Sequence, residues 1–117
     1  ASDVYKRQIL SLLQNCEKYA VSFEKIVEKI AHNPAIIFKV NNRGFIRKGY
    51  FADIVLIDTN TPTIVTKDTL LYKCGWSPFE GQKFDNSIYK TILNGNVVYE
   101  DGKVNSIPYG KKITFNR

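Results

Sequence analysis

Two dipeptides in the last quarter of the chain restrict its fold more than any other feature. Asn94-Gly95 separates the extended candidates at residues 89–93 and 96–100, and Asp101-Gly102 follows directly. Both pairs favour two-residue hairpin turns, because each central position of such a turn needs a positive φ. We therefore predict three antiparallel strands in a meander, with residues 113–115 as a candidate for one more strand.

The first third of the chain has helical spacing instead. Apolar residues recur between positions 9 and 16, which predicts a short amphipathic helix that ends near residues 18–20. Ser22 is a favourable N-cap for a second helix. The apolar face of that helix consists of Phe23, Ile26, Val27 and Ile30. Asn33-Pro34 then predicts a restart as a further helical turn or two.

The pattern changes again after Gly44. Residues 54–57 form a short apolar run of strand length, and residues 63–66 are another extended candidate. Several aromatic residues are expected to pack on a half-buried sheet; these are Phe45, Tyr50, Phe51, Tyr72, Tyr89 and Tyr99. The predicted fold class is α+β, with N-terminal helices followed by an antiparallel β meander.

Composition excludes several classes of protein. The chain has 117 residues, 44% of them hydrophobic, which suits one ordinary domain. No apolar run approaches the roughly 18 residues of a membrane span. The net charge is +6, but the basic residues are scattered along the sequence, with the densest group at Arg43, Arg47 and Lys48. We interpret them as a solvated surface and predict no nucleic-acid or membrane partner.

Candidate chemical groups are sparse. His32 is the only histidine, and Cys16 and Cys74 do not form a CxxC pair, so we expect a structural imidazole and two buried, reduced thiols. Gly44 and Gly49 are spaced as in a phosphate loop, but Tyr50-Phe51 replaces the Lys and Ser/Thr that would bind phosphate and magnesium. The sequence therefore predicts no catalytic, cofactor-binding or metal-binding residue in this chain.

The loop at residues 73–81 contains the only tryptophan, in the sequence KCGWSPFEG. Ser77 has no candidate base close to it in sequence, so a nucleophilic role is not favoured. We interpret the loop as a plug at the edge of a sheet, anchored by the rings of Trp76 and Phe79.

Three segments together resemble the C-terminal end of one enzyme family. They are KGYFADIVLID at residues 48–58, YKCGWSPFEG at residues 72–81 and NGNVVYEDG at residues 94–102. Their order and spacing are similar to those of dihydroorotases. The Ser22 helix, His32-Asn33-Pro34-Ala35 and Ala52-Asp53 resemble metal-dependent amidohydrolases more widely, whereas the Trp76 loop is similar to dihydroorotases in particular.

This resemblance implies a division of the chain. Members of the family fold as an eight-stranded β/α barrel with a small β-sandwich. Residues 9–43 would be the last barrel helices, and residues 44–117 the C-terminal part of the sandwich. Residues 1–8 look like a translated sequencing adaptor joined to an incomplete gene, and the chain contains no Met. We expect these eight residues to be an artefact, and the rest to be a C-terminal fragment.

The resemblance also implies an activity for the parent protein. Dihydroorotases use zinc to catalyse the reversible cyclisation of carbamoyl aspartate to dihydroorotate in pyrimidine biosynthesis. Their ligands are an HxH pair, a carboxylated Lys and two further His, with a catalytic Asp, and none of these motifs occurs here. We expect a cytoplasmic parent hydrolase with a small-molecule substrate and a possible homo-oligomeric state, and a fragment that binds no zinc and is inactive.

Two alternatives remain open. The parent could be another cyclic amidohydrolase of hydantoinase or allantoinase type, which would share the helix and the Ala52-Asp53 strand. It could also be a non-catalytic homologue that acts as a scaffold.

Overall fold

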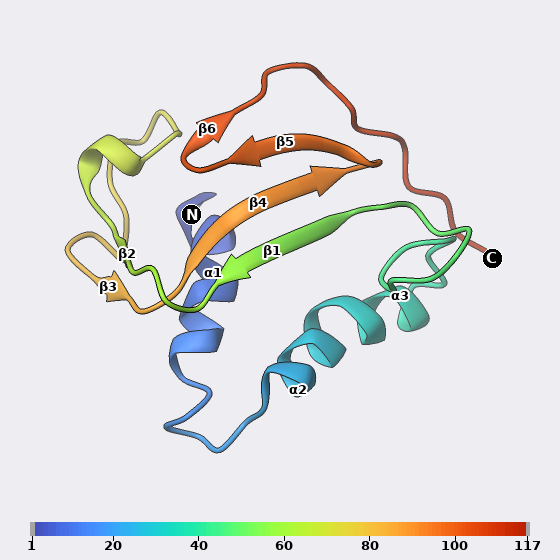
Figure 1. Cartoon of the computed structure of the whole chain (residues 1–117), viewed down its shortest axis with the longest axis horizontal. Coiled ribbons are helices and arrows are strands. Elements are labelled where there is room, and N and C mark those ends of the chain that lie inside the picture. Colours follow the sequence, from blue (N-terminus) through green and yellow to red (C-terminus); the bar gives the residue numbers. More distant parts are fainter. Residues whose placement is uncertain (1, 117) are drawn as a thin grey trace. The chain divides into compact units, whose positions relative to one another are not determined.

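The computed structural model describes residues 2–116 and divides into two compact units (Figure 1). The first unit contains Ala1–Val21 and Asp58–Ser87, and the second contains Ser22–Ile57 and Ile88–Arg117. Helices precede an antiparallel sheet in chain order, so the predicted α+β class is confirmed. The predicted boundary at residue 43 concerns the parent enzyme and stays a prediction.

The first unit is built on helix α1, Ser2–Gln14. It also contains β2 (Thr63–Ile64), the 3₁₀ helix η2 (Lys67–Thr69) and β3 (Lys83–Phe84), and β2 pairs antiparallel with β3. Most of the fully buried apolar side chains belong to this unit: Leu10, Leu13, Cys16, Val65 and Phe84. The apolar spacing noted between residues 9 and 16 therefore identifies the buried face of α1.

The bounds predicted for this first helix were wrong at both ends. The helix begins at Ser2 rather than at residue 9, because residues 2–8 contain no Gly or Pro to interrupt it. It ends at Gln14, where the amides of Asn15 and Cys16 donate to carbonyls three residues back and tighten the last turn. Arg7 is buried and donates to the Thr69 carbonyl oxygen and to Thr69 Oγ1. An adaptor origin for residues 1–8 stays a prediction.

The second unit begins with a helical segment of three parts. Helix α2 (Phe23–Val27) passes directly into the π turn η1 (Glu28–His32) and then into α3 (Asn33–Ile37). The predicted cap is confirmed, because Ser22 Oγ accepts a hydrogen bond from the Lys25 amide at 3.2 Å. The helical turn predicted after Asn33-Pro34 is confirmed as α3, with Pro34 in its first turn. The predicted break with Asn33 as a cap was wrong, because α3 continues η1 directly and its N-cap position, His32, makes no side-chain capping hydrogen bond. Pro34 cannot donate to the carbonyl four residues back and its ring crowds that carbonyl, and the wide π turn before it keeps the helix continuous.

The sheet of the second unit has the strand order β1-β4-β5-β6. Its strands are β1 (Ile54–Asp58), β4 (Ser87–Leu93), β5 (Asn96–Glu100) and β6 (Lys103–Val104). Asn94 and Gly95 have φ values of 50° and 79°, and Asp101 and Gly102 have 45° and 81°. Both hairpin turns and the three-stranded meander are therefore confirmed, and β1 adds a fourth strand beside β4.

The last residues do not extend this meander. Phe115 forms an antiparallel bridge with Val40, and the Asn41 amide donates to the Thr114 carbonyl at 2.9 Å. The further strand considered at residues 113–115 is thus reduced to a bridge with the segment after α3. The strand expected at residues 63–66 is also shorter, because Thr66 caps the following 3₁₀ helix.

The second unit buries few of its apolar side chains. Among the described residues only Ala35 of this unit is a fully buried apolar residue. The helical face noted in the sequence is largely in solvent, since Phe23, Val27 and Ile30 are each 44% exposed. A unit of this size ordinarily has a core of its own. No helix in the described part of the chain is long and apolar enough to cross a membrane.

Candidate functional site

The densest polar network of the second unit is centred on the Asp53 carboxylate. One oxygen accepts from Arg43 Nη1, and the other accepts from the Asn94 amide at 2.9 Å. The Gly95 amide donates to the neighbouring Ala52 carbonyl at 3.0 Å. The side chains of Arg43 and Asp53 are only 11% and 28% exposed. Both carboxylate oxygens are engaged, so Asp53 holds the β4–β5 turn rather than serving as a free base.

Aromatic rings and cations surround this network. Arg43 lies over the Phe51 ring with its Cζ atom 4.2 Å from the centroid, and Lys111 Nζ lies 5.7 Å from the same centroid. Arg47 lies over the Phe45 ring at 4.0 Å. Such contacts are favourable because the face of an aromatic ring carries partial negative charge.

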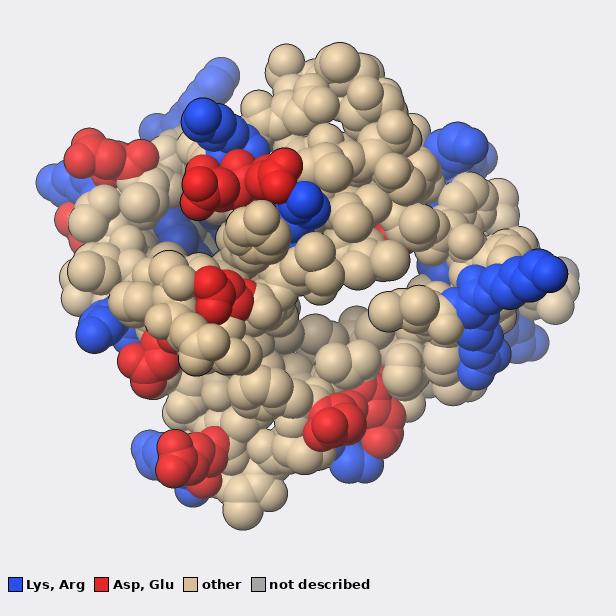
Figure 2. All heavy atoms as spheres, viewed as in Figure 1, with Lys and Arg blue, Asp and Glu red and all other residues tan. Residues whose placement is uncertain are grey.

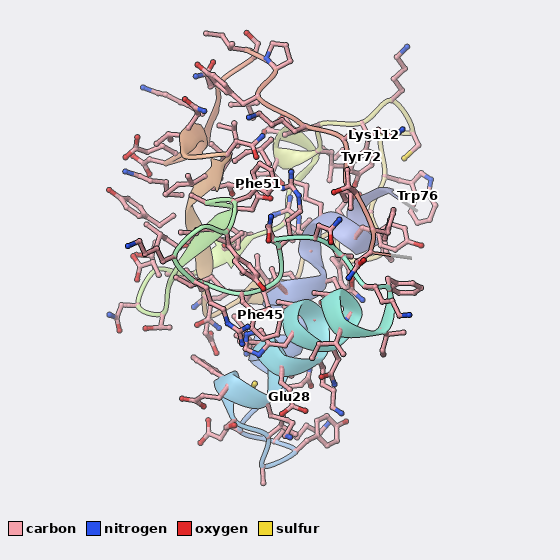
Figure 3. The ribbon with its side chains drawn as sticks, turned by 90° about the vertical axis from the view of Figure 1, so that its right-hand side faces the viewer. Glu28, Phe45, Phe51, Tyr72, Trp76 and Lys112 are labelled. Atoms are coloured by element: carbon pink, nitrogen blue, oxygen red, sulfur yellow. The ribbon has the colours of Figure 1, made fainter. Side chains whose placement is uncertain are left out.

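The expected position on strands of the sheet was wrong for four of the six aromatic residues. Phe45, Tyr50 and Phe51 lie in the loop before β1, and Tyr72 lies in the loop between η2 and β3. Figure 3 shows Phe45 beside the helical segment, where its ring stacks on His32 with a centroid separation of 4.4 Å. The spacing of apolar residues does not distinguish a strand from a loop that packs on a helix, because aromatic residues are buried in both.

Gly44 explains how closely this loop approaches the helix. It has a φ of +82°, and a Cβ atom at this position would lie 2.4 Å from Ala35 Cβ and 2.8 Å from the Ala31 carbonyl oxygen. Only glycine fits such an approach without displacement of the backbone.

The single histidine packs against the loop before β1. His32 lies flat against Phe45, with 7° between the ring planes. No group of three or more His, Cys, Asp or Glu side chains that could hold a metal ion occurs among residues 2–116. The described residues therefore do not by themselves fit the zinc that the resemblance implies for the parent.

The two cysteines differ in their environments. Cys16 is buried, as expected, and its thiol donates to the Leu12 carbonyl at 3.6 Å. Cys74 is exposed, so the prediction of two buried thiols was wrong for this residue. It lies in a loop with Gly75 at positive φ, where no strand or helix covers the side chain.

The Trp76 loop is held by its second half. Ser77 is buried, and its hydroxyl oxygen accepts from the Phe79 amide at 3.0 Å. The Phe79 ring packs edge-on against Phe84 at 5.7 Å, and the Gly81 amide donates to the Val65 carbonyl. Phe79 anchors the loop as predicted, but Trp76 does not, since 56% of it is exposed.

One cavity of about 510 Å³ lies along the β5–β6 hairpin, between Val97 and Asn105. Its charged side chains include Glu100, which pairs with Lys90 at 2.7 Å. The pair raises the pKa of the Lys90 ammonium, chiefly through the hydrogen bond from Lys90 to Glu100. The residues that line the cavity include no His, Cys or Ser.

Comparison with known proteins gives the class of protein. The model of the amidohydrolase family matches residues 3–98, and the chain belongs to this family. Two solved structures support the same fold. The chain superimposes on a D-hydantoinase with a TM-score of 0.73 and 25% identity, covering 82% of this chain and 21% of that structure. It superimposes on L-hydantoinase (dihydropyrimidinase) from Arthrobacter aurescens with a TM-score of 0.70 and 30% identity, covering 80% and 21%.

Within the family, curated relatives include dihydroorotases, which confirms the predicted resemblance. The chain is 35% identical to dihydroorotase from Pyrococcus furiosus over 102 residues, which are 87% of this chain and 24% of that protein. It is 39% identical to allantoinase from Desulfitobacterium hafniense over 89 residues, which are 76% of this chain and 20% of that protein. The chain thus spans about a quarter or less of the length of these relatives.

Proposed function

We propose that this chain is the C-terminal part of a dihydroorotase, in which the catalytic residues belong to the remainder of the enzyme. The parent would catalyse the reversible, zinc-dependent cyclisation of carbamoyl aspartate to dihydroorotate in pyrimidine biosynthesis, in the cytoplasm. The observation that carries this proposal is the family match over residues 3–98, together with 35% identity to a dihydroorotase over 87% of the chain.

The architecture of the second unit supports this role. It has a four-stranded sheet and a hydrogen-bonded Asp53 network, yet its helical face is partly exposed to solvent. Exposed apolar surface of this kind marks an interface. In the proposed enzyme the face formed by Phe23, Val27 and Ile30 packs on the outside of the barrel, and the meander completes the small sandwich.

An allantoinase or hydantoinase is the second candidate. It is favoured by the 39% identity to an allantoinase and by the superposition on two hydantoinases. The Trp76 loop favours a dihydroorotase by resemblance, and 56% of the Trp76 residue is exposed. A non-catalytic homologue is the third candidate.

One experiment separates these candidates. A long sequencing read across the source locus would cover Gln8 and roughly 300 upstream residues, the length of a barrel of this kind. We expect an HxH pair, a later Lys, two further His and a late Asp. The expressed parent would then be assayed with dihydroorotate, allantoin and a hydantoin.

Each result has one meaning. Turnover of dihydroorotate alone supports the proposal, and preference for allantoin or a hydantoin assigns the parent to the second candidate. An upstream barrel without the ligand residues identifies a non-catalytic homologue. Zinc-dependent hydrolysis by the purified 117-residue chain would overturn the proposal that the catalytic residues lie in the remainder of the enzyme.

A further inference from the structure

The second unit holds the whole net charge of the protein, because its 11 basic and 5 acidic residues sum to +6 and the first unit has six of each. We call residues 33–53 and 105–116 the cationic lobe. These residues include six Lys or Arg and a single carboxylate, Asp53, for a net charge of +5, whereas the rest of the chain has 11 basic and 10 acidic residues. A surface of one sign creates a potential that selects partners of the opposite sign.

Tertiary contacts join the two segments of the cationic lobe. The Asn116 amide donates to the Lys39 carbonyl at 2.8 Å, beside the bridge between Val40 and Phe115. Lys111, from the C-terminal segment of the lobe, lies over the ring of Phe51, which belongs to the other segment. On the side where α3, the following loop and the C-terminal segment lie in Figure 1, Figure 2 shows Lys and Arg side chains with few Asp or Glu beside them.

The Arg side chains of the lobe are positioned by rings and by Asp53. Arg43 is bonded to Asp53 and lies over Phe51. Arg47 is exposed and lies over Phe45 and Tyr50, and no carboxylate among the described residues lies within ion-pair distance of it. A guanidinium held in one orientation is suited to paired hydrogen bonds with a carboxylate, because less side-chain entropy is lost on binding.

Strongly exposed apolar side chains adjoin the cations in the sequence. Ile46 is 85% exposed and immediately precedes Arg47 and Lys48. The end of α3 and the residue after it add Ile36, Ile37 and Phe38, each at least 60% exposed. An apolar centre with a charged rim is the usual composition of a protein interface.

We propose that the cationic lobe is a docking face for a protein surface that has an apolar centre and an acidic rim. The inference rests on the proposed function, in which that surface belongs to the catalytic part of the same enzyme. A second copy of the chain does not fit, because two faces of charge +5 repel each other.

Other polyanions fit less well. Single-stranded nucleic acid would need open rings beside the cations for stacking. Phe38 and Phe115 are exposed, but the rings that contact the Arg side chains are occupied, Phe45 by His32 and Arg47, and Phe51 by Arg43 and Lys111. Anionic lipid attracts basic residues without requiring fixed guanidinium planes. The positioned Arg side chains therefore favour carboxylates on a protein.

Binding of the whole 117-residue chain to a model ligand tests the inference. The probe is a fluorescent helical peptide made of Glu and Leu, compared with a matched peptide in which Gln replaces Glu. Anisotropy titrations would be run at about 50 mM and about 300 mM salt, because screening weakens exposed charge pairs. We expect the Glu peptide to bind about tenfold more tightly than the Gln peptide at low salt.

Variants locate the binding face. Arg47→Glu with Lys48→Glu should weaken binding of the Glu peptide about tenfold, and Ile46→Ser should weaken binding of both peptides. The matched control, Lys73→Glu with Lys103→Glu, makes the same change of net charge outside the lobe and should stay within about twofold of the unchanged protein. Circular dichroism would verify that each variant is folded.

Three results would overturn the inference. One is equal weakening by the control pair, and another is equal affinity for the two peptides. The third is binding of a DNA duplex or of phosphatidylserine vesicles at least as tight as that of the Glu peptide. None of these readouts involves turnover. A parent without metal ligands would therefore not contradict the docking face, and failed binding would not contradict the enzymatic assignment.

Discussion

Individual residues at the join of loop, helix and hairpin determine how the second unit is held together. Gly44 allows the loop after α3 to lie against the helix, and Asp53 ties the start of β1 to the turn between β4 and β5. The second contact is long-range, because Asn94 follows Asp53 by 41 positions in the sequence. The motifs GYFAD and NGN are therefore linked in the structure, because Asp53 and Ala52 of the first accept hydrogen bonds from the Asn94 and Gly95 amides of the second.

Because Gly44 lies so close to the helix, the methyl group of an Ala at this position should reduce the stability of the fold strongly. Gly44→Ala should destabilise the fold by more than the roughly 1–2 kcal/mol of a left-handed Ala, because the new Cβ would also collide with Ala35 and Ala31. Gly49→Ala is the matched control, since Gly49 has a φ of +85° but nothing within 4 Å of its Cβ position. Urea midpoints measure both, and equal losses would show that the close approach is absent.

Removal of the charge of Asp53 should also lower the unfolding free energy. Asp53→Asn keeps an acceptor for the Asn94 amide but leaves Arg43, which is mostly buried, without its counter-charge. We expect a loss of about 1–3 kcal/mol in unfolding free energy. Asp101→Asn is the control and should be near neutral, because Asn suits the positive φ of that turn. A neutral Asp53→Asn would contradict the role of the network.

At the scale of elements, some features are determined by short local signals and others by long-range packing. The Ser22 cap and the two hairpin turns depend on a few adjacent residues, and all three occur where the sequence predicts them. The ends of α1, the π turn and the pairing of residues 113–115 depend on neighbours distant in sequence or on the response of a helix to Pro34. Sequence patterns carry little information about these responses.

The turn that follows β1 gives a prediction about pH. The Thr61 hydroxyl and the Asn60 amide donate to the Asp58 carboxylate, and these hydrogen bonds lower its pKa below the ordinary value of 3.8. A lowered folded-state pKa stabilises the fold above pH 3.8, and this stabilisation is lost as the pH falls through the lowered value.

Thermal unfolding between pH 5 and pH 2 would reveal this effect, in the acid range where carboxylates become protonated. Asp58→Asn should lower the melting temperature near neutral pH and show a shallower decline in acid than the unchanged protein. Identical declines for both proteins would rule out Asp58 as a contributor.

At the scale of the whole molecule, the surplus of exposed apolar surface is the dominant property. Among the residues whose burial the structure describes, five of the six buried apolar residues belong to the first unit. The second unit instead presents apolar side chains on its helical segment and on the cationic lobe. The physical consequence is a chain whose stability depends on what covers these faces.

This property predicts the behaviour of the purified chain. We expect self-association through the helical face, whose charges Glu24, Lys25, Glu28 and Lys29 sum to zero and do not oppose pairing. Phe23→Ser with Val27→Ser should reduce the sedimentation coefficient at high protein concentration, whereas Lys73→Ser with Lys103→Ser should not. A clean monomer with a sharp, cooperative melt would contradict this expectation.

The sequence by itself determined the elements whose causes are local: the α+β class, the Ser22 cap, the two positive-φ turns and the family resemblance. Only the tertiary structure decided which residues meet. It placed Phe45 on His32 and not on a strand, left Trp76 and Cys74 in solvent, and gathered basic residues that are scattered in the sequence into one lobe. The physical reason is that a cap or turn is stabilised within four or five residues, whereas burial and charge clustering depend on segments brought together by the fold.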